Sequence, residues 1–123
     1  MANPNIVAVT NIVGNTLSAA VLTTATQLAS NAASSGKVFK INSIVIANID
    51  GTSAADVTVN IYSAAALGGT ALAIASTISV PADASLIVSD KTTAFYLLEN
   101  QSIGALASAA GDLVATISFE EIT

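Results

Sequence analysis

The sequence predicts an all-β protein: an antiparallel β-sandwich of the jelly-roll type, with roughly seven or eight strands and an N-terminal arm. Apolar and polar residues alternate in several short runs, as they do in half-buried strands. Turn residues interrupt these runs about every 8–12 residues, which is the spacing of a sandwich or barrel. The length of 123 residues fits one domain.

The first 36 residues leave two alternatives open. Residues 6–13 fit a strand, and residues 16–36 are rich in Ala, Ser and Thr and contain no charged residue. One alternative makes the segment 1–36 a pair of edge strands of the sandwich. The other makes it an arm that adds to a neighbouring subunit, because a terminus that its own domain does not hold is free to do so. In both, residues 37–123 form the sandwich domain.

Two runs, residues 56–62 and 112–120, alternate most regularly. Successive side chains of a strand point to opposite faces, so each run has one apolar and one polar face. We expect the apolar faces to share one core, formed by Val57, Val59, Ile61, Leu113, Ile117 and Phe119. The opposite face of the last run is a polar outer surface formed by Thr116, Ser118 and Glu120.

The remaining strands are predicted from apolar runs between turn residues. Residues 38–49 are apolar on both faces, as in a central strand that is covered on each side. Further strand candidates are residues 71–80, 85–89, 94–99 and 102–107. The turns between the strands are predicted at Asp50-Gly51, Gly68-Gly69, Pro81-Ala82-Asp83 and Gly111-Asp112.

The composition favours assembly with other proteins. Hydrophobic residues make up 53% of the chain and charged residues 9%. A surface with so few charges can be buried against a neighbour without desolvating many ions. The only cations are Lys37, Lys40 and Lys91, and the net charge is -5. No basic stripe for nucleic acid can be built from them, and no run of about 20 apolar residues predicts a membrane span.

The sequence favours no enzymatic activity, and we assign no catalytic, cofactor-binding or metal-binding residue. The chain contains neither Cys nor His. Thiolate nucleophiles, Cys/His zinc sites and the side chain best suited to proton transfer near neutral pH are therefore excluded.

Pairs of acidic residues are candidates for acid–base chemistry or metal binding. Asp50 and Asp56 flank a loop, but their spacing does not match that of a calcium loop, and Asp beside Gly is common in turns. Glu120 and Glu121 are adjacent, so on a strand they point to opposite faces and cannot share a substrate.

Other candidates are equally weak. Ser89 lacks a base other than Lys91, and Gly68-Gly69-Thr70 lacks the lysine of a phosphate-binding loop. Asn100-Gln101-Ser102 matches a glycosylation acceptor, a short pattern that is frequent by chance. Among the aromatic residues, Phe39 and Phe119 have apolar neighbours and are expected in the core. Tyr62 and Tyr96 remain as surface candidates.

Several runs in the last two thirds of the chain carry a resemblance to a known class of proteins. They are VFKINSIVIAN at 38–48, Asp50-Gly51, AADVTV at 54–59, ISVPADASL at 78–86 and FEEI at 119–122. These runs resemble small virion structural proteins of tailed bacteriophages, particularly cyanophages. Members of that class often carry Gly-Asp after a Glu near the fifth or sixth strand, whereas Glu99 is followed here by Asn100-Gln101.

The resemblance implies a non-enzymatic structural protein on the outer surface of a virion. The leading hypothesis is a capsid decoration, or cement, protein that stabilises the shell and forms a homo-oligomer, with a trimer favoured, on the major capsid protein. The alternative is a neck, tail or fibre-attachment component. A further alternative, from another class, is a carbohydrate- or calcium-binding β-sandwich module.

Overall fold

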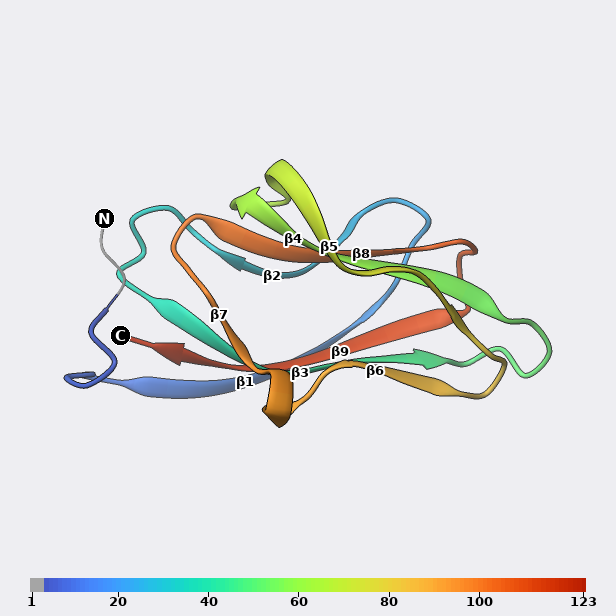
Figure 1. Ribbon diagram of the computed structural model, residues 1–123, viewed down its shortest axis with the longest axis horizontal. Helices are drawn as coiled ribbons and strands as arrows, with labels where there is room; N and C mark the ends of the chain where they lie inside the picture. Colours follow the sequence, from blue (N-terminus) through green and yellow to red (C-terminus); the bar gives the residue numbers. More distant parts are fainter. Residues whose placement is uncertain (1–3) are drawn as a thin grey trace.

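The computed structural model describes residues 4–123 and consists of two antiparallel sheets packed face to face (Figure 1). Sheet A has the order β1-β9-β3-β6, with β7 also paired to β3, and sheet B has the order β2-β8-β4-β5. The strands are β1 (Ile12–Ala20), β2 (Thr26–Asn31), β3 (Val38–Asn48), β4 (Ala55–Ala64), β5 (Gly68–Val80), β6 (Ser85–Ser89), β7 (Phe95–Leu97), β8 (Gln101–Ala107) and β9 (Leu113–Ile122). A 3₁₀ turn, η1 (Lys91–Thr93), joins β6 to β7. The predicted all-β sandwich is confirmed.

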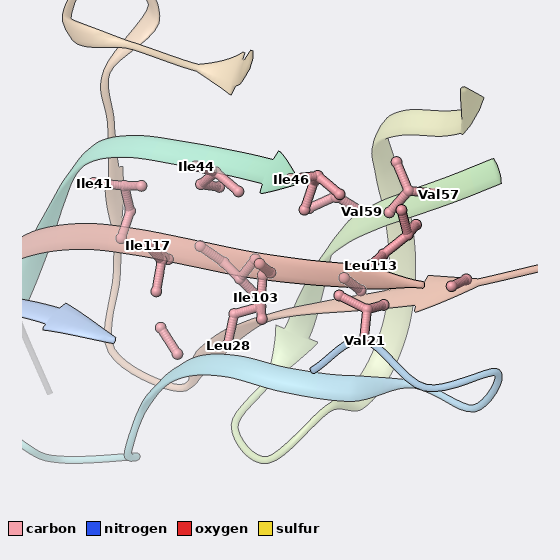
Figure 2. Packing of buried hydrophobic residues seen from close by; sticks show 14 of the residues in the cluster. Val21, Leu28, Ile41, Ile44, Ile46, Val57, Val59, Ile103, Leu113 and Ile117 are labelled. Carbon is pink, nitrogen blue, oxygen red and sulfur yellow. The ribbon is translucent and has the colours of Figure 1, made fainter. Parts of the chain in front are cut away.

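The core lies between the two sheets and is made mainly of aliphatic side chains from both (Figure 2). The predicted shared core is confirmed for five of its residues, because Val57, Val59, Leu113, Ile117 and Phe119 belong to one buried cluster. Ile61 is partly buried and packs against that cluster. The predicted outer set on β9, Thr116, Ser118 and Glu120, alternates with the core residues and is half-buried.

β3 lies in the middle of sheet A, between β9 on one side and β6 and β7 on the other. Its inward residues Ile41, Ile44 and Ile46 are fully buried. Its outward residues Lys40 and Val45 are half-buried. The expectation that both faces of this strand are covered is therefore wrong at these positions, where only the face toward sheet B is closed.

Residues 12–31 lie in the two sheets as edge strands. β1 pairs with β9 in sheet A and β2 pairs with β8 in sheet B. The chain crosses between the sheets at Val21, which is fully buried. The expected strand at residues 6–13 is misplaced, because the amide of Ala8 donates to the Asn5 carbonyl and that of Val7 to the Asn5 side chain, which forms a turn. β1 begins only at Ile12.

Most predicted turns lie where the sequence placed them. Asp83 and Gly111 both have positive φ, at 58° and 88°, in the turns before β6 and β9. The reversal expected at Gly68-Gly69 is wrong, because residues 65–67 make the turn and both glycines belong to β5. Among residues 4–123 there is no helix with the length and apolarity that a membrane span requires.

Candidate functional site

The sandwich has two open sides, because within residues 4–123 the outermost strands of each sheet have one unpaired edge. β1 and β6 end sheet A, and β2 and β5 end sheet B. β1 contacts β2 across one side, and β6 contacts β5 across the other. We call these the β1/β2 side and the β5/β6 side (Figure 1). Unpaired edges expose backbone donors and acceptors to which another strand can add.

On the β1/β2 side, β1 exposes apolar side chains. Leu17 is opposite the core residue Ile117, so it points toward sheet B, yet it is 52% exposed. Val13 has the same orientation and is 47% exposed. β1 contains neither a charged residue nor proline. It therefore lacks the two residue types that commonly protect a free edge from pairing.

On the β5/β6 side, β5 is long and almost fully exposed. Its 13 residues include Leu72, Ile74 and Ile78, and Leu72 is 68% exposed. The chain has no charged residue between Asp56 and Asp83, so β5 is uncharged along its whole length. Both open sides thus present long, uncharged and apolar edges.

A hollow of about 220 Å³ lies on the β5/β6 side. It is lined by Ile74 of β5, Val88 and Ser89 of β6, Thr93 of η1 and Phe95 of β7. The Ser89 hydroxyl is engaged with Thr93, within 3.1 Å of its hydroxyl oxygen. The remaining lining is aliphatic and aromatic, so the hollow suits an apolar side chain rather than a polar ligand.

The tip of the β4–β5 hairpin folds onto the outside of sheet B and fixes the start of β5. Its amides donate to three polar side chains: Ala65 to Asn100, Ala66 to Ser30 and Leu67 to Ser102. Leu67 and Tyr62 lie over Gly104, where an added Cβ would be 2.7 Å from Leu67 Cδ2. Tyr62, expected at the surface, is therefore buried, and that prediction is wrong.

The tyrosine at position 96 is 44% exposed, in agreement with its prediction as a surface residue. Phe39 and Phe119 are buried in the core as predicted. Asn100 and Ser102 of the glycosylation pattern are engaged with the hairpin tip, because their side-chain oxygens accept hydrogen bonds from its amides.

Acidic side chains gather at one end of the sandwich. Asp50, Asp83 and Asp112 lie in neighbouring turns, which are joined by backbone hydrogen bonds from Ile49 to Asp112 and from Asp83 to Asp50. Hydrogen bonds from the backbone and hydroxyl of Thr52 hold the pKa of Asp50 below its usual value. Within residues 4–123 no group of three or more acidic residues is arranged to hold a metal ion.

The two glutamates of β9 lie at the other end and make separate contacts. Glu121 forms an ion pair with Lys37 at 3.1 Å and accepts a hydrogen bond from Asn15 at 2.7 Å. Glu120 accepts from Asn42 at 3.5 Å. The two carboxylates thus have different partners, as their expected opposite orientation requires.

Sequence reasoning did not identify the open sides as a site. The sequence feature that indicates them is the lack of charged residues in residues 1–36 and in the run between Asp56 and Asp83. Composition alone does not say which strands end a sheet, because the edge position depends on the strand order.

The comparisons with known proteins give a likeness of fold. No family model matches the chain, and no curated protein matches it. A solved structure from work on Bacillus endospore appendages, described as a family of disulfide-linked pili, is similar with a TM-score of 0.53 and 20% sequence identity. The similarity covers 99% of this chain and 98% of the other, so it extends over the whole sandwich.

Proposed function

We propose that this protein is a non-enzymatic structural subunit that assembles with copies of itself through its two open sides. The observation that carries the proposal is the pair of long, uncharged edges, β1 and β5, at opposite sides of one sandwich. Pairing of such edges satisfies backbone hydrogen bonds and buries apolar side chains without desolvating a charge.

The fold supports the same proposal. The similar solved structure comes from work on appendages that form pili, so a sandwich of this kind is compatible with a polymer. The disulfide linkage of those pili does not transfer, because this chain contains no cysteine. The assembly that we propose therefore involves no disulfide bond.

The place of action that we propose is the outside of a particle. The resemblance to phage virion proteins favours a decoration protein on a capsid, and the net charge of -5 suits a position away from packaged nucleic acid. When one side of a subunit binds the other side of the next, the subunits close into a ring, such as a trimer, or continue as a filament. Which of the two forms depends on the rotation between neighbours.

Sedimentation velocity over a concentration series, together with negative-stain electron microscopy, tests the proposal. We expect rings or filaments that grow with protein concentration. Ile74→Lys places a charge on the β5 edge and should shift the protein toward monomer, whereas Thr52→Lys, in the exposed turn between β3 and β4, should not. A wild-type protein that stays monomeric at every concentration and fails to bind undecorated phage heads contradicts the proposal.

A further inference from the structure

We propose that the two open sides join in a defined register, in which β1 of one copy lies antiparallel to β6 of the next. In this arrangement Leu17 of the first copy fills the hollow between Ile74, Val88 and Phe95 of the second. The inference rests on the proposed function and specifies the contact between subunits, which the proposed function does not define.

Strand direction allows this contact in both sheets at once. Neighbouring strands are antiparallel throughout the orders β1-β9-β3-β6 and β2-β8-β4-β5. Because each order contains four strands, its two end strands run in opposite directions. A second copy placed beside the first in the same orientation therefore brings β1 antiparallel to β6, and β2 antiparallel to β5. Both sheets then continue from one copy into the next.

The register of sheet A places Leu17 at the hollow. Leu17 pairs with Ile117, Ile117 with Ile44, and Ile44 with Ser89. Directly opposed residues of neighbouring strands lie in one row and on one face of the sheet. Extending this row by one strand puts Leu17 of the next copy beside Ser89, which lines the hollow.

The register of sheet B leads to the same hollow. Thr26 pairs with Ala105, Ala105 with Val59, and Val59 with Ala75. The next copy therefore places its Thr26 beside Ala75, which is adjacent to Ile74 in the hollow. The rows of both sheets thus end beside the hollow, at Ser89 of β6 and at Ala75 next to Ile74 of β5.

Charge favours a second copy as the occupant. β1 and β5 contain no charged residue, and the hollow is lined by none. An acidic or basic partner would find no counter-charge on these strands, whereas a second copy brings an equally uncharged strand. Leu17 and Val13 are exposed at the β1/β2 side, and the hollow is on the β5/β6 side. Each copy therefore offers one half of the contact at each side.

Disulfide trapping tests the register, because the protein has no cysteine of its own. The outward row of sheet A runs Ser18, Thr116, Val45, Ile87. In the proposed contact Ser18 of one copy is opposite Ile87 of the next, at the Cα distance of about 4.5–5.5 Å that a disulfide accepts. Both side chains are exposed. A mixture of Ser18→Cys and Ile87→Cys proteins should give a covalent dimer on mild oxidation.

Ile12→Cys is the matched control. It lies on the same face of β1 as Ser18, six residues away, which is about 20 Å along a strand. Mixed with Ile87→Cys, it should give roughly tenfold less dimer, since a disulfide requires close Cα atoms. Within one chain, Ser18 and Ile87 are three strand spacings apart, about 14 Å, so a link in the double variant must join two copies.

The outcomes separate this inference from the proposed function. Preferential linkage of Ser18→Cys to Ile87→Cys supports the register. Assembly in sedimentation without that linkage, equal linkage by Ile12→Cys, or efficient linkage of Ser18→Cys to itself overturns the register and leaves self-assembly intact. Absence of both assembly and linkage overturns the two proposals together.

Discussion

The ring of Phe39 on β3 stacks on the ring of Phe119 on β9, with centroids 5.1 Å apart and planes inclined by 23°. These strands are neighbours in the middle of sheet A, and the stack closes the core at the end where the chain terminates. The stack buries part of the inward face of β9, whereas Thr116, Ser118 and Glu120 on its outward face are only half-buried.

Replacing Ile117 or Phe119 by Ala should lower the free energy of unfolding by about 2–5 kcal/mol, because lost burial is joined by a cavity. Both side chains are at most 5% exposed. Thr116→Ala and Ser118→Ala should cost much less, since these side chains point outward. Thermal unfolding of the four variants measures the contrast. Equal destabilisation by the outward pair would show that both faces of β9 are buried.

Gly104→Ala should destabilise the protein by about 1–3 kcal/mol, because the added methyl group overpacks the hairpin tip. The new Cβ would lie 2.7 Å from Leu67 Cδ2 and 3.2 Å from the Thr26 carbonyl oxygen. Leu67→Ala in the same chain should restore part of the loss. Chemical denaturation of both single variants and the double variant gives their coupling, and additive effects would refute this contact.

Asn48→Asp should destabilise the fold by about 1–3 kcal/mol, the cost of unsatisfied buried groups. The Asn48 amide donates to the carbonyls of Ser53 and Val80, both at 2.9 Å, and the side chain is nearly fully buried. An ionised carboxylate cannot donate. Asp50→Asn, at the exposed turn beside it, is the control and should cost less in urea unfolding at neutral pH. The reverse order would contradict the assigned bonds.

The carboxyl group of Asp50 should titrate below its ordinary pKa of 3.8, because Thr52 donates to it from both backbone and side chain. A depressed folded pKa gives stability that is present above the unfolded pKa and is lost as the pH falls through the folded pKa. This loss therefore lies below pH 3.8. Thr52→Val removes one donor and should raise the pKa of Asp50 in an NMR titration. An unchanged midpoint would exclude that hydrogen bond.

Deleting residues 2–11 should leave a cooperatively folding sandwich, because β1 begins at Ile12. Deleting residues 2–30 should abolish folding, because it removes β1, most of β2 and the buried side chains of Val21 and Leu28. Circular dichroism and thermal unfolding distinguish the two. A folded product of the longer deletion would mean that residues 12–30 act as a separable arm.

Strands with one buried and one outward face could be predicted from sequence. The range 85–89 agrees with β6, and the alternation around Ile117 placed β9 correctly. A strand that is buried on one side alternates apolar and polar residues with a period of two. β1 was displaced because both of its faces are exposed, so its sequence contains no such contrast.

The candidate site could be predicted only as a property of composition. Few charges indicated assembly, but the neighbours of Leu17 and Ile74 depend on strand order, which is set by contacts distant in sequence. The burial of Tyr62 was missed for the same reason. It depends on Gly104 in another strand and on the folded hairpin tip.

A high-resolution electron microscopy reconstruction of the assembled protein would show directly which strands join neighbouring subunits. We expect subunits in the same orientation, with β1 of one copy hydrogen-bonded antiparallel to β6 of the next and the Leu17 side chain in the hollow beside Ile74. Subunits that meet through their loops or outer sheet faces, with both open sides still facing solvent, would contradict it.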